Sequence, residues 1–298
     1  TIMKQAFIKL HLSILLAGWT GVFGRLISLN EGLLVWYRLM LASLLFFLFL
    51  GVIKKLRKVP IREALFMGAT GFLLALHWIF FYGSIKASNV SIGVICFSSI
   101  GFFTAFLEPI FNHKRISVKE VAFSLLTLLG ISLIFSFDTR YRMGIGLGIF
   151  SSLLCALYTL ANKRVSQGKT ASTVLLYQFS GGFLCVSCLL PFYLHFFPVK
   201  TLLPNSADCF YLFFFVVFCT LVMYILQIQA LKKISAFTVN LSYNLEPVYS
   251  IIIAMLLFNE ARDLNISFYF GVCFIILSVL LQSLSVMSFW RNYSILNT

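Results

Sequence analysis

The chain alternates between long apolar runs and short polar connections. A helix needs about twenty apolar residues to cross the hydrocarbon core of a bilayer, and runs of about that length recur along the whole sequence. They span residues 8–28, 33–53, 63–84, 88–110, 118–137, 143–164, 172–196, 208–230, 236–258 and 266–287. The connections are too short to hold a sizeable soluble domain. The pattern predicts an all-α integral membrane protein with ten transmembrane helices.

Basic residues gather on one side of this arrangement. Lysine and arginine are enriched in the cytoplasmic loops of membrane proteins. The first side holds Lys4, Lys9, Lys54, Lys55, Arg57, Lys58, Arg62, Lys114, Arg115, Lys119, Lys163, Arg164, Lys169, Lys232, Lys233 and Arg291. The opposite side holds only Lys86, Arg140, Arg142, Lys200 and Arg262. The bias predicts that both termini lie in the cytoplasm. Together with the apolar runs, the expected location is a bacterial inner (plasma) membrane.

Composition agrees with this class and excludes others. The chain is 60% hydrophobic and 11% charged, whereas soluble domains are about 25% charged. The net charge of +14 would suggest nucleic acid in a soluble protein, but here it follows membrane topology, so no nucleic-acid partner is expected. The sequence has no H-E-x-x-H, G-x-S-x-G or G-x-x-x-x-G-K-[ST] motif and no Cys/His metal cluster. Neither an enzyme nor a metal or other cofactor is predicted.

The ninth run carries the strongest candidate for chemistry. Glu246 and Pro247 lie near its middle. A carboxylate at membrane depth is costly and normally faces a protein interior or a water-filled cavity. Proline removes a backbone donor and interrupts a helix. Glu246 is therefore a candidate proton carrier or ligand for an amine; alternatively, it caps broken backbone or pairs permanently with an arginine.

Polar residues extend from Glu246 along the same helix at four-residue steps, which place them on one face. This polar stripe consists of Thr238, Ser242, Glu246 and Ser250. It makes Ser242 a second candidate for the binding site.

Two halves of the chain, 1–138 and 139–298, share short segments. At an offset of 147 residues, Tyr82–Asn89 aligns with Gln229–Ala236, and Ser99 aligns with Glu246. Each half contains five expected spans, and because five is odd, the second half must enter the membrane in the opposite sense. The sequence thus predicts a 5+5 inverted-topology repeat, an architecture that places substrate near the membrane midplane.

These features resemble a known family. The spans, the segments FYGSIKASN and QALKKISA, Glu246-Pro247 and Phe258-Asn259-Glu260 are similar to the EamA-type branch of the drug/metabolite transporter superfamily. The resemblance covers nearly the whole chain, with one EamA-type repeat in each half. It implies secondary transport of small metabolites, often amino-acid export, through a central cavity.

The fourth span departs from the family pattern. The usual proline after a small polar residue is replaced by Ser99-Ile100, and Glu108-Pro109 stands nine residues closer to the cytoplasmic end. We therefore expect this helix to bend away from the family position. Glu108 lies close to the cytoplasmic basic cluster and is predicted to form an interfacial ion pair.

Two arginines lie near the outer ends of the first two spans. Arg25 and Arg38 either extend to the lipid headgroups or line a vestibule and bind a substrate carboxylate, for which a planar guanidinium is suited. The remaining candidates share membrane depth and polar or aromatic character, although hydrogen bonding within the bundle and interfacial aromatic belts are alternative explanations. They are His77, Trp78, Trp19, Tyr158, Tyr224 and Ser99.

The combined prediction is a secondary transporter of small metabolites, above all an exporter of amino acids or related amphipathic compounds by alternating access. Its partners would be a small-molecule solute, the lipid bilayer and, if transport is coupled, protons; it would act as a monomer or homodimer. One alternative is a broad-specificity extruder of drugs or lipid-like compounds. Another is a non-transporting membrane assembly or sensor protein.

Overall fold

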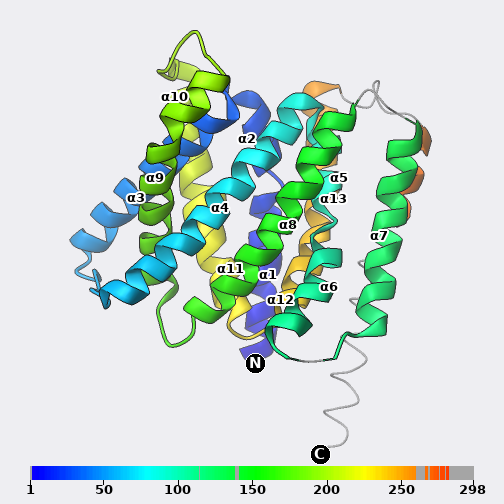
Figure 1. Cartoon of the computed structure of the whole chain (residues 1–298), viewed down its shortest axis with the longest axis horizontal. Coiled ribbons are helices and arrows are strands. Elements are labelled where there is room, and N and C mark those ends of the chain that lie inside the picture. Colours follow the sequence, from blue (N-terminus) through cyan, green and yellow to red (C-terminus); the bar gives the residue numbers. More distant parts are fainter. Residues whose placement is uncertain are drawn as a thin grey trace, which may run out of the picture.

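The computed structural model describes residues 2–113, 115–137, 141–259, 266–267, 269–274, 276–278 and 280–281. Within these ranges the chain is helical, without strands, and the helices run side by side as a bundle (Figure 1). The first half contains α1 (Ile2–Ala17), α2 (Thr20–Leu26), α3 (Glu31–Val52), α4 (Ile61–Ala87), α5 (Val90–Phe97), α6 (Ile100–Phe111) and α7 (Val118–Phe137). The second contains α8 (Arg142–Val165), α9 (Ala171–Phe196), α10 (Ser206–Val216), α11 (Met223–Leu231), α12 (Ala236–Ser242) and α13 (Glu246–Phe258).

Eight stretches of the described chain are helical, long and apolar enough to cross a membrane. They are Met3–Leu26, Glu31–Val52, Ile61–Ala87, Val90–Phe111, Arg142–Val165, Ala171–Phe196, Ser206–Leu231 and Ala236–Phe258. The protein is thus a multi-pass membrane protein. Helix α7 coincides with the fifth expected span, whereas the tenth, 266–287, lies partly outside the described residues.

Helix α4 lies at the centre of the bundle. It packs against α8, α9 and α3, and Figure 1 shows it crossing the front of the molecule between α9 and α8. The α4–α9 contact depends on small residues: a Cβ atom on Gly71 would collide with the backbone of Gln178, and one on Gly181 with the backbone of Gly68. Such close backbone approach is typical of membrane helix packing. It fixes the position of the α4 side chains that reach the interior.

Several membrane-crossing stretches are interrupted near their middle. The stretch Met3–Leu26 breaks between α1 and α2, and Ala236–Phe258 contains a 3₁₀ turn, η3 (Tyr243–Leu245). The stretch Ser206–Leu231 contains a π-helical segment, η2 (Val217–Val222), a feature that often marks functional sites. The break before α13 lies at Pro247, which occupies the first turn of that helix. The predicted interruption by Pro247 is confirmed.

The fourth span breaks at Ser98 and Ser99, which corrects the expectation that it bends away from the family position. The Ser99 hydroxyl donates to the carbonyl of Cys96 at 2.9 Å, and the amide of Ser98 bonds Ile95 in a tight i−3 contact. Serine side chains compete with the helix for backbone carbonyls, so they supply the break without a proline. Pro109 instead lies inside α6.

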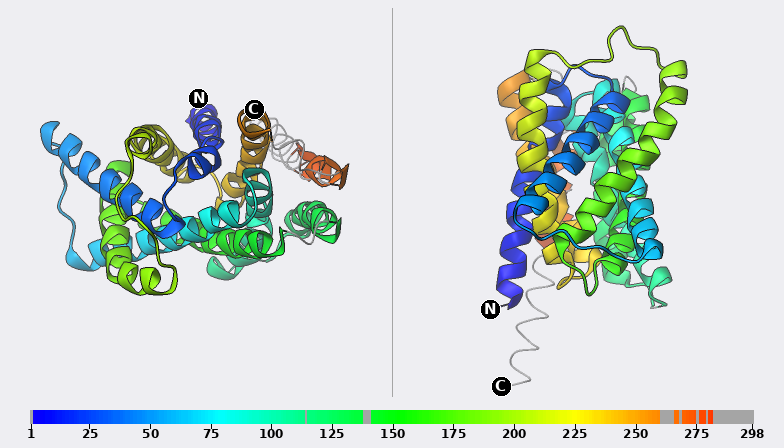
Figure 2. Two further views of the ribbon diagram at one scale, coloured as in Figure 1. Left: turned by 90° about the horizontal axis from the view of Figure 1, so that it is seen from above. Right: turned by 90° about the vertical axis from the view of Figure 1, so that its left-hand side faces the viewer.

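At each end of the bundle a buried or half-buried carboxylate bonds to the backbone of a neighbouring segment. At the end near the N-terminus, Glu108 lies 3.8 Å from Lys163 and accepts the Phe237 amide at 2.7 Å, at the start of α12. The predicted interfacial ion pair of Glu108 is confirmed. At the opposite end, where the α9–α10 connection lies (Figure 2), Asp208 accepts the backbone amide of Ser28 at 2.7 Å.

Candidate functional site

A small central cavity lies where the interrupted helices meet. Its lining residues come from both halves of the chain and are Ala17, Thr20, Arg38, His77, Trp78, Phe81, Tyr82, Phe97, Ile100, Cys155, Met223, Tyr224, Gln227, Asn240, Tyr243 and Glu246. The cavity volume is about 30 Å³. That is room for about one or two water molecules and far below the ~300 Å³ at the lower end of ligand pockets. A metabolite can therefore enter only after helices move apart.

Glu246 is the first residue of α13 and is 3% exposed. Among the described residues it has one hydrogen-bond partner, the hydroxyl of Thr20, at 3.2 Å from Oε1. The same hydroxyl lies 2.7 Å from the carbonyl oxygen of Ala17. A threonine hydroxyl has one proton, so Thr20 cannot donate to both oxygens at once. When its proton is directed to Ala17, the contact with Glu246 is a hydrogen bond only if the carboxyl group is protonated and donates.

Arg38 brings a second buried charge to the cavity, from α3. Its Nε donates to Thr220 Oγ1 at 2.8 Å, Nη1 to Tyr82 Oη at 2.7 Å and Nη2 to the Cys219 carbonyl at 3.0 Å. The π-helical segment η2 supplies Thr220 and the Cys219 carbonyl. The three bonds leave two of the five guanidinium N–H groups for a ligand.

Aromatic rings hold Arg38 from two sides. The guanidinium carbon lies 3.5 Å from the centre of the Trp78 ring and 4.2 Å from that of Phe215. Cation–π contacts of this kind stabilise a charge that has been removed from water. The ion pairs found among the described residues do not join Arg38 to Glu246. The cavity therefore holds a buried basic group and a buried acidic group without a direct ion pair between them.

His77 and Trp78 occupy adjacent positions on α4, and each is bonded within the bundle. His77 Nδ1 lies 2.7 Å from Ser151 Oγ, whose hydroxyl donates to the His77 carbonyl at 3.0 Å. Because the serine proton is used there, Nδ1 carries a proton and donates. Trp78 Nε1 donates to Tyr224 Oη at 3.0 Å. Both side chains line the cavity and are positioned by these bonds.

Comparison with known proteins gives the family. The model of the EamA-like transporter family matches residues 6–136 and again residues 142–284. The chain belongs to this family. Its EamA matches cover most of the chain, so it is a transporter that acts on a small-molecule solute in a lipid membrane, and the family assignment points away from an enzyme.

Two curated relatives are also named as transporters, and one solved structure shares the fold. An uncharacterized transporter, YxxF, of Bacillus subtilis is 25% identical over 262 residues, 84% of this chain and 81% of its own length. An uncharacterized transporter of Haemophilus influenzae is 23% identical over 274 residues, covering 86% of both chains. A crystal structure at 13% identity matches with a TM-score of 0.71, covering 96% of this chain and 99% of its own. That likeness shows the fold alone.

The cavity gathers five of the predicted site residues: Glu246, Arg38, His77, Trp78 and Tyr224. Other candidates lie elsewhere. Trp19 is 40% exposed at the start of α2, and Arg25, also exposed, stacks on the Phe258 ring at 4.5 Å near the end of α13. Tyr158 is buried behind the cavity, where its hydroxyl accepts from Asn162 Nδ2 at 3.1 Å. These three side chains do not line the cavity.

The two candidate serines bond to the protein itself. Ser99 Oγ contacts Ser152 Oγ, and the Ser242 hydroxyl donates to the Thr238 carbonyl of its own helix at 2.7 Å. The predicted stripe is therefore not one continuous face: Asn240, and not Ser242, shares the cavity with Glu246. The reason is the 3₁₀ turn at η3, which has three residues per turn instead of 3.6. It rotates the side chains of α13 about the helix axis relative to those of α12.

Sequence reasoning did not select Thr20, Tyr82, Gln227, Asn240 or Tyr243 as site residues, although all five line the cavity. Thr20, Gln227 and Asn240 carry a signal that could have found them, because each is a polar residue within a long apolar run. Tyr82 and Tyr243 carry none, since tyrosine is common at membrane interfaces and in helix contacts.

Proposed function

We propose that this EamA-family protein is a secondary transporter that exports amino acids or related amphipathic compounds by alternating access, with Glu246 as the proton-binding group. The observation that carries the proposal is the pair of buried ionisable groups, acidic Glu246 and basic Arg38, on one small cavity without a mutual ion pair. A zwitterion carries both charges at a short separation. It could therefore engage both groups when the cavity opens.

Proton coupling is supported by the hydrogen-bond geometry at Glu246. The Thr20 hydroxyl lies closer to the Ala17 carbonyl, at 2.7 Å, than to Glu246, at 3.2 Å. This arrangement thus suits a protonated carboxyl group. Binding an ammonium group would favour the charged carboxylate and release that proton, which couples solute and proton at one site.

The proposed architecture is a 5+5 inverted repeat of residues 1–138 and 139–298 in a bacterial inner membrane, with both termini in the cytoplasm. The breaks at Ser99 and Glu246 support it, since they lie 147 residues apart, the offset that also aligns other segments. The uneven distribution of basic residues supports the orientation. Monomer or homodimer, and the absence of a nucleic-acid partner, remain predictions.

The deciding experiment is counterflow uptake into proteoliposomes at two pH values, with radiolabelled amino acids and organic cations, for wild type and Glu246→Gln. We expect uptake of an amino acid that depends on pH in wild type and loses that dependence, or is abolished, in the variant. Unchanged uptake by the variant at both pH values would remove Glu246 from the mechanism. No flux from correctly folded wild-type protein would favour an assembly or sensor role.

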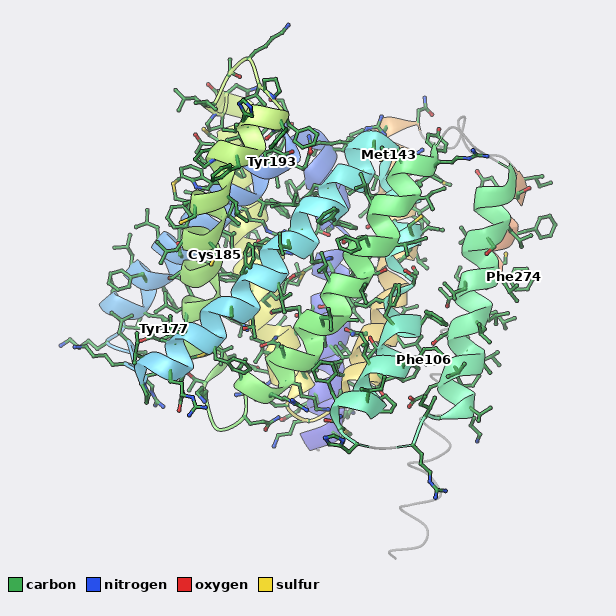
Figure 3. All side chains as sticks on the ribbon, in the orientation of Figure 1. Phe106, Met143, Tyr177, Cys185, Tyr193 and Phe274 are labelled. Atoms are coloured by element: carbon green, nitrogen blue, oxygen red, sulfur yellow. The ribbon has the colours of Figure 1, made fainter. Side chains whose placement is uncertain are left out.

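A specific observation favours a second candidate, a broad extruder of hydrophobic compounds. An apolar groove of about 610 Å³ lies between α4, α8 and α9, with Leu76, Phe80, Leu147 and Leu189 among its lining residues. Met143 and Tyr193, labelled on either side of α4 in Figure 3, also line it. A hydrophobic solute could reach the protein from the lipid through this groove. Flux of bulky hydrophobic cations but not of amino acids in the same assay would select this function.

A further inference from the structure

Gln227 is a buried polar side chain of the central cavity with an unused hydrogen-bonding group. It lies on α11 and is 6% exposed, and its Oε1 has no hydrogen-bond partner within the described part of the chain. Buried amide oxygens are nearly always paired in folded proteins, because an unpaired one gives up its bonds to water without replacement. An exception that lines a cavity is explained if a ligand supplies the missing donor.

The other polar groups of the cavity have partners in the protein. Asn240 donates to Thr104 Oγ1 at 2.9 Å and accepts from Thr159 Oγ1 at 3.1 Å. Tyr243, which lies next to Gln227, donates to Ser13 Oγ at 3.0 Å. In the described structure the cavity groups with unused accepting capacity are therefore Gln227 Oε1, the Glu246 carboxyl group and Nε2 of His77, whose proton is on Nδ1. This part of the cavity calls for a ligand that donates hydrogen bonds.

We propose that Gln227 accepts a hydrogen bond from the ammonium group of the transported solute, beside Glu246, and so selects amines with N–H groups over fully methylated ones. This inference rests on the proposed transport function and adds the chemical class of the bound group. A primary ammonium has three N–H donors, enough for Gln227, Glu246 and one further acceptor. A trimethylammonium group has the same charge but no donor, and it leaves Gln227 unpaired.

Charge alone does not make this distinction. The Glu246 carboxylate and the aromatic faces of Trp78, Phe81 and Tyr224 attract either cation. A site built to hydrogen-bond a substrate group discriminates strongly against an analogue that lacks it. The preference for N–H groups is therefore a property of Gln227 that can be separated from the affinity for cations in general.

The test measures inhibition of counterflow by matched pairs of compounds in proteoliposomes. The pairs are L-phenylalanine with N,N,N-trimethyl-L-phenylalanine, and phenethylamine with its trimethylammonium analogue, with the better primary amine of the wild type as tracer. The variants are Gln227→Met, which keeps the side-chain length but removes the acceptor, and Gln227→Glu, which keeps an acceptor. Gln229→Met is the matched control, because Gln229 is on the same helix but does not line the cavity. Thermal unfolding of each variant verifies folding.

We expect the wild type to prefer the primary amine by at least about tenfold, as one hydrogen bond to a charged group implies. Gln227→Met should bring the two inhibition constants within about twofold of each other, with the trimethyl compound little affected. Gln227→Glu and Gln229→Met should retain the preference.

Two results would overturn the inference while leaving the transport function intact. They are equal inhibition by both members of a pair in the wild type, and an unchanged preference in a folded Gln227→Met. A wild type that moves neither primary amine, with its fold intact, would instead reject the proposed function and this inference with it.

Discussion

The stretches Val90–Phe111 and Ala236–Phe258 are both interrupted near their middle, yet the side chains at the two breaks differ. In the former, α5 ends and α6 begins around Ser99. In the latter, α12 gives way through η3 to α13 at Glu246. Both breaks turn backbone away from regular helical bonding near the middle of the bundle.

The chemistry at the two breaks is different. Ser99 is paired with Ser152 and with the Cys96 carbonyl, so its polar atoms are used within the protein. Glu246 has only the shared Thr20 hydroxyl. At Ser99 the helix break thus has its polar side-chain atoms bonded within the protein. At Glu246 the break leaves a carboxyl group with unused hydrogen-bonding capacity. The comparison teaches that a helix break by itself does not identify a binding site; the unmet bonding capacity at the break does.

The largest expected effect is at the ninth-span break. Glu246→Gln keeps the shape but removes the titrating group that faces Arg38, His77, Tyr82, Cys155 and Tyr243 across the cavity. We expect flux to fall about 100-fold, or to lose its dependence on pH, since a charge-assisted bond contributes about 3 kcal/mol. Proteoliposome flux between pH 6 and 8 measures it, with Glu63→Gln, on the bundle surface, as control.

Arg38→Lys tests the basic group of the cavity, as Glu246→Gln tests the acidic one. Lysine keeps the charge but cannot reach Thr220, Tyr82 and the Cys219 carbonyl together, and it loses the planar stacking on Trp78. We expect a destabilisation of about 2 kcal/mol, from buried acceptors left unpaired, and a flux at least ~10-fold lower. Thermal unfolding and transport report the two effects separately. A variant with wild-type flux would exclude recognition of a carboxylate by the guanidinium fork.

Ser99→Ala tests the fourth-span break and should have a moderate effect on stability alone. The variant loses the contacts with Ser152 and the Cys96 carbonyl, at about 1 kcal/mol. Flux should stay within about twofold of wild type once the protein is folded. A large loss of transport with unchanged stability would show that the two breaks are chemically alike, contrary to the structure.

Ser242→Ala should have the smallest effect. Its hydroxyl bonds only to the Thr238 carbonyl of the same helix in the described structure, so stability should change by less than about 0.5 kcal/mol. Asn240→Ala is the informative partner, because it leaves Thr104 and Thr159 without their shared amide. Equal melting temperatures for the two variants would contradict the assignment of Asn240, rather than Ser242, to the cavity.

These differences show which features could be predicted from the sequence and which could not. Run length and polarity are local, so the membrane class, the helix interruption at Pro247 and the ion pair of Glu108 could be predicted. The inward direction of a side chain is not local: it depends on helix rotation, which η3 changes for Ser242 and Asn240. The sequence likewise contains no signal for the π-helical segment η2, because its extra residue per turn is stabilised by Arg38 from a distant helix. Trp19 and Tyr158 are candidates because they are aromatic residues at expected membrane depth, and neither property fixes the face that a side chain occupies.

The small volume of the central cavity has a consequence for the energy of the cell. About 30 Å³ is too little for a continuous file of water across the bilayer, and a file of water is what lets protons leak. Moving one elementary charge through a potential of 100 mV releases about 2.3 kcal/mol, so an open path would discharge the membrane continuously. A cavity of this size therefore does not by itself provide such a path.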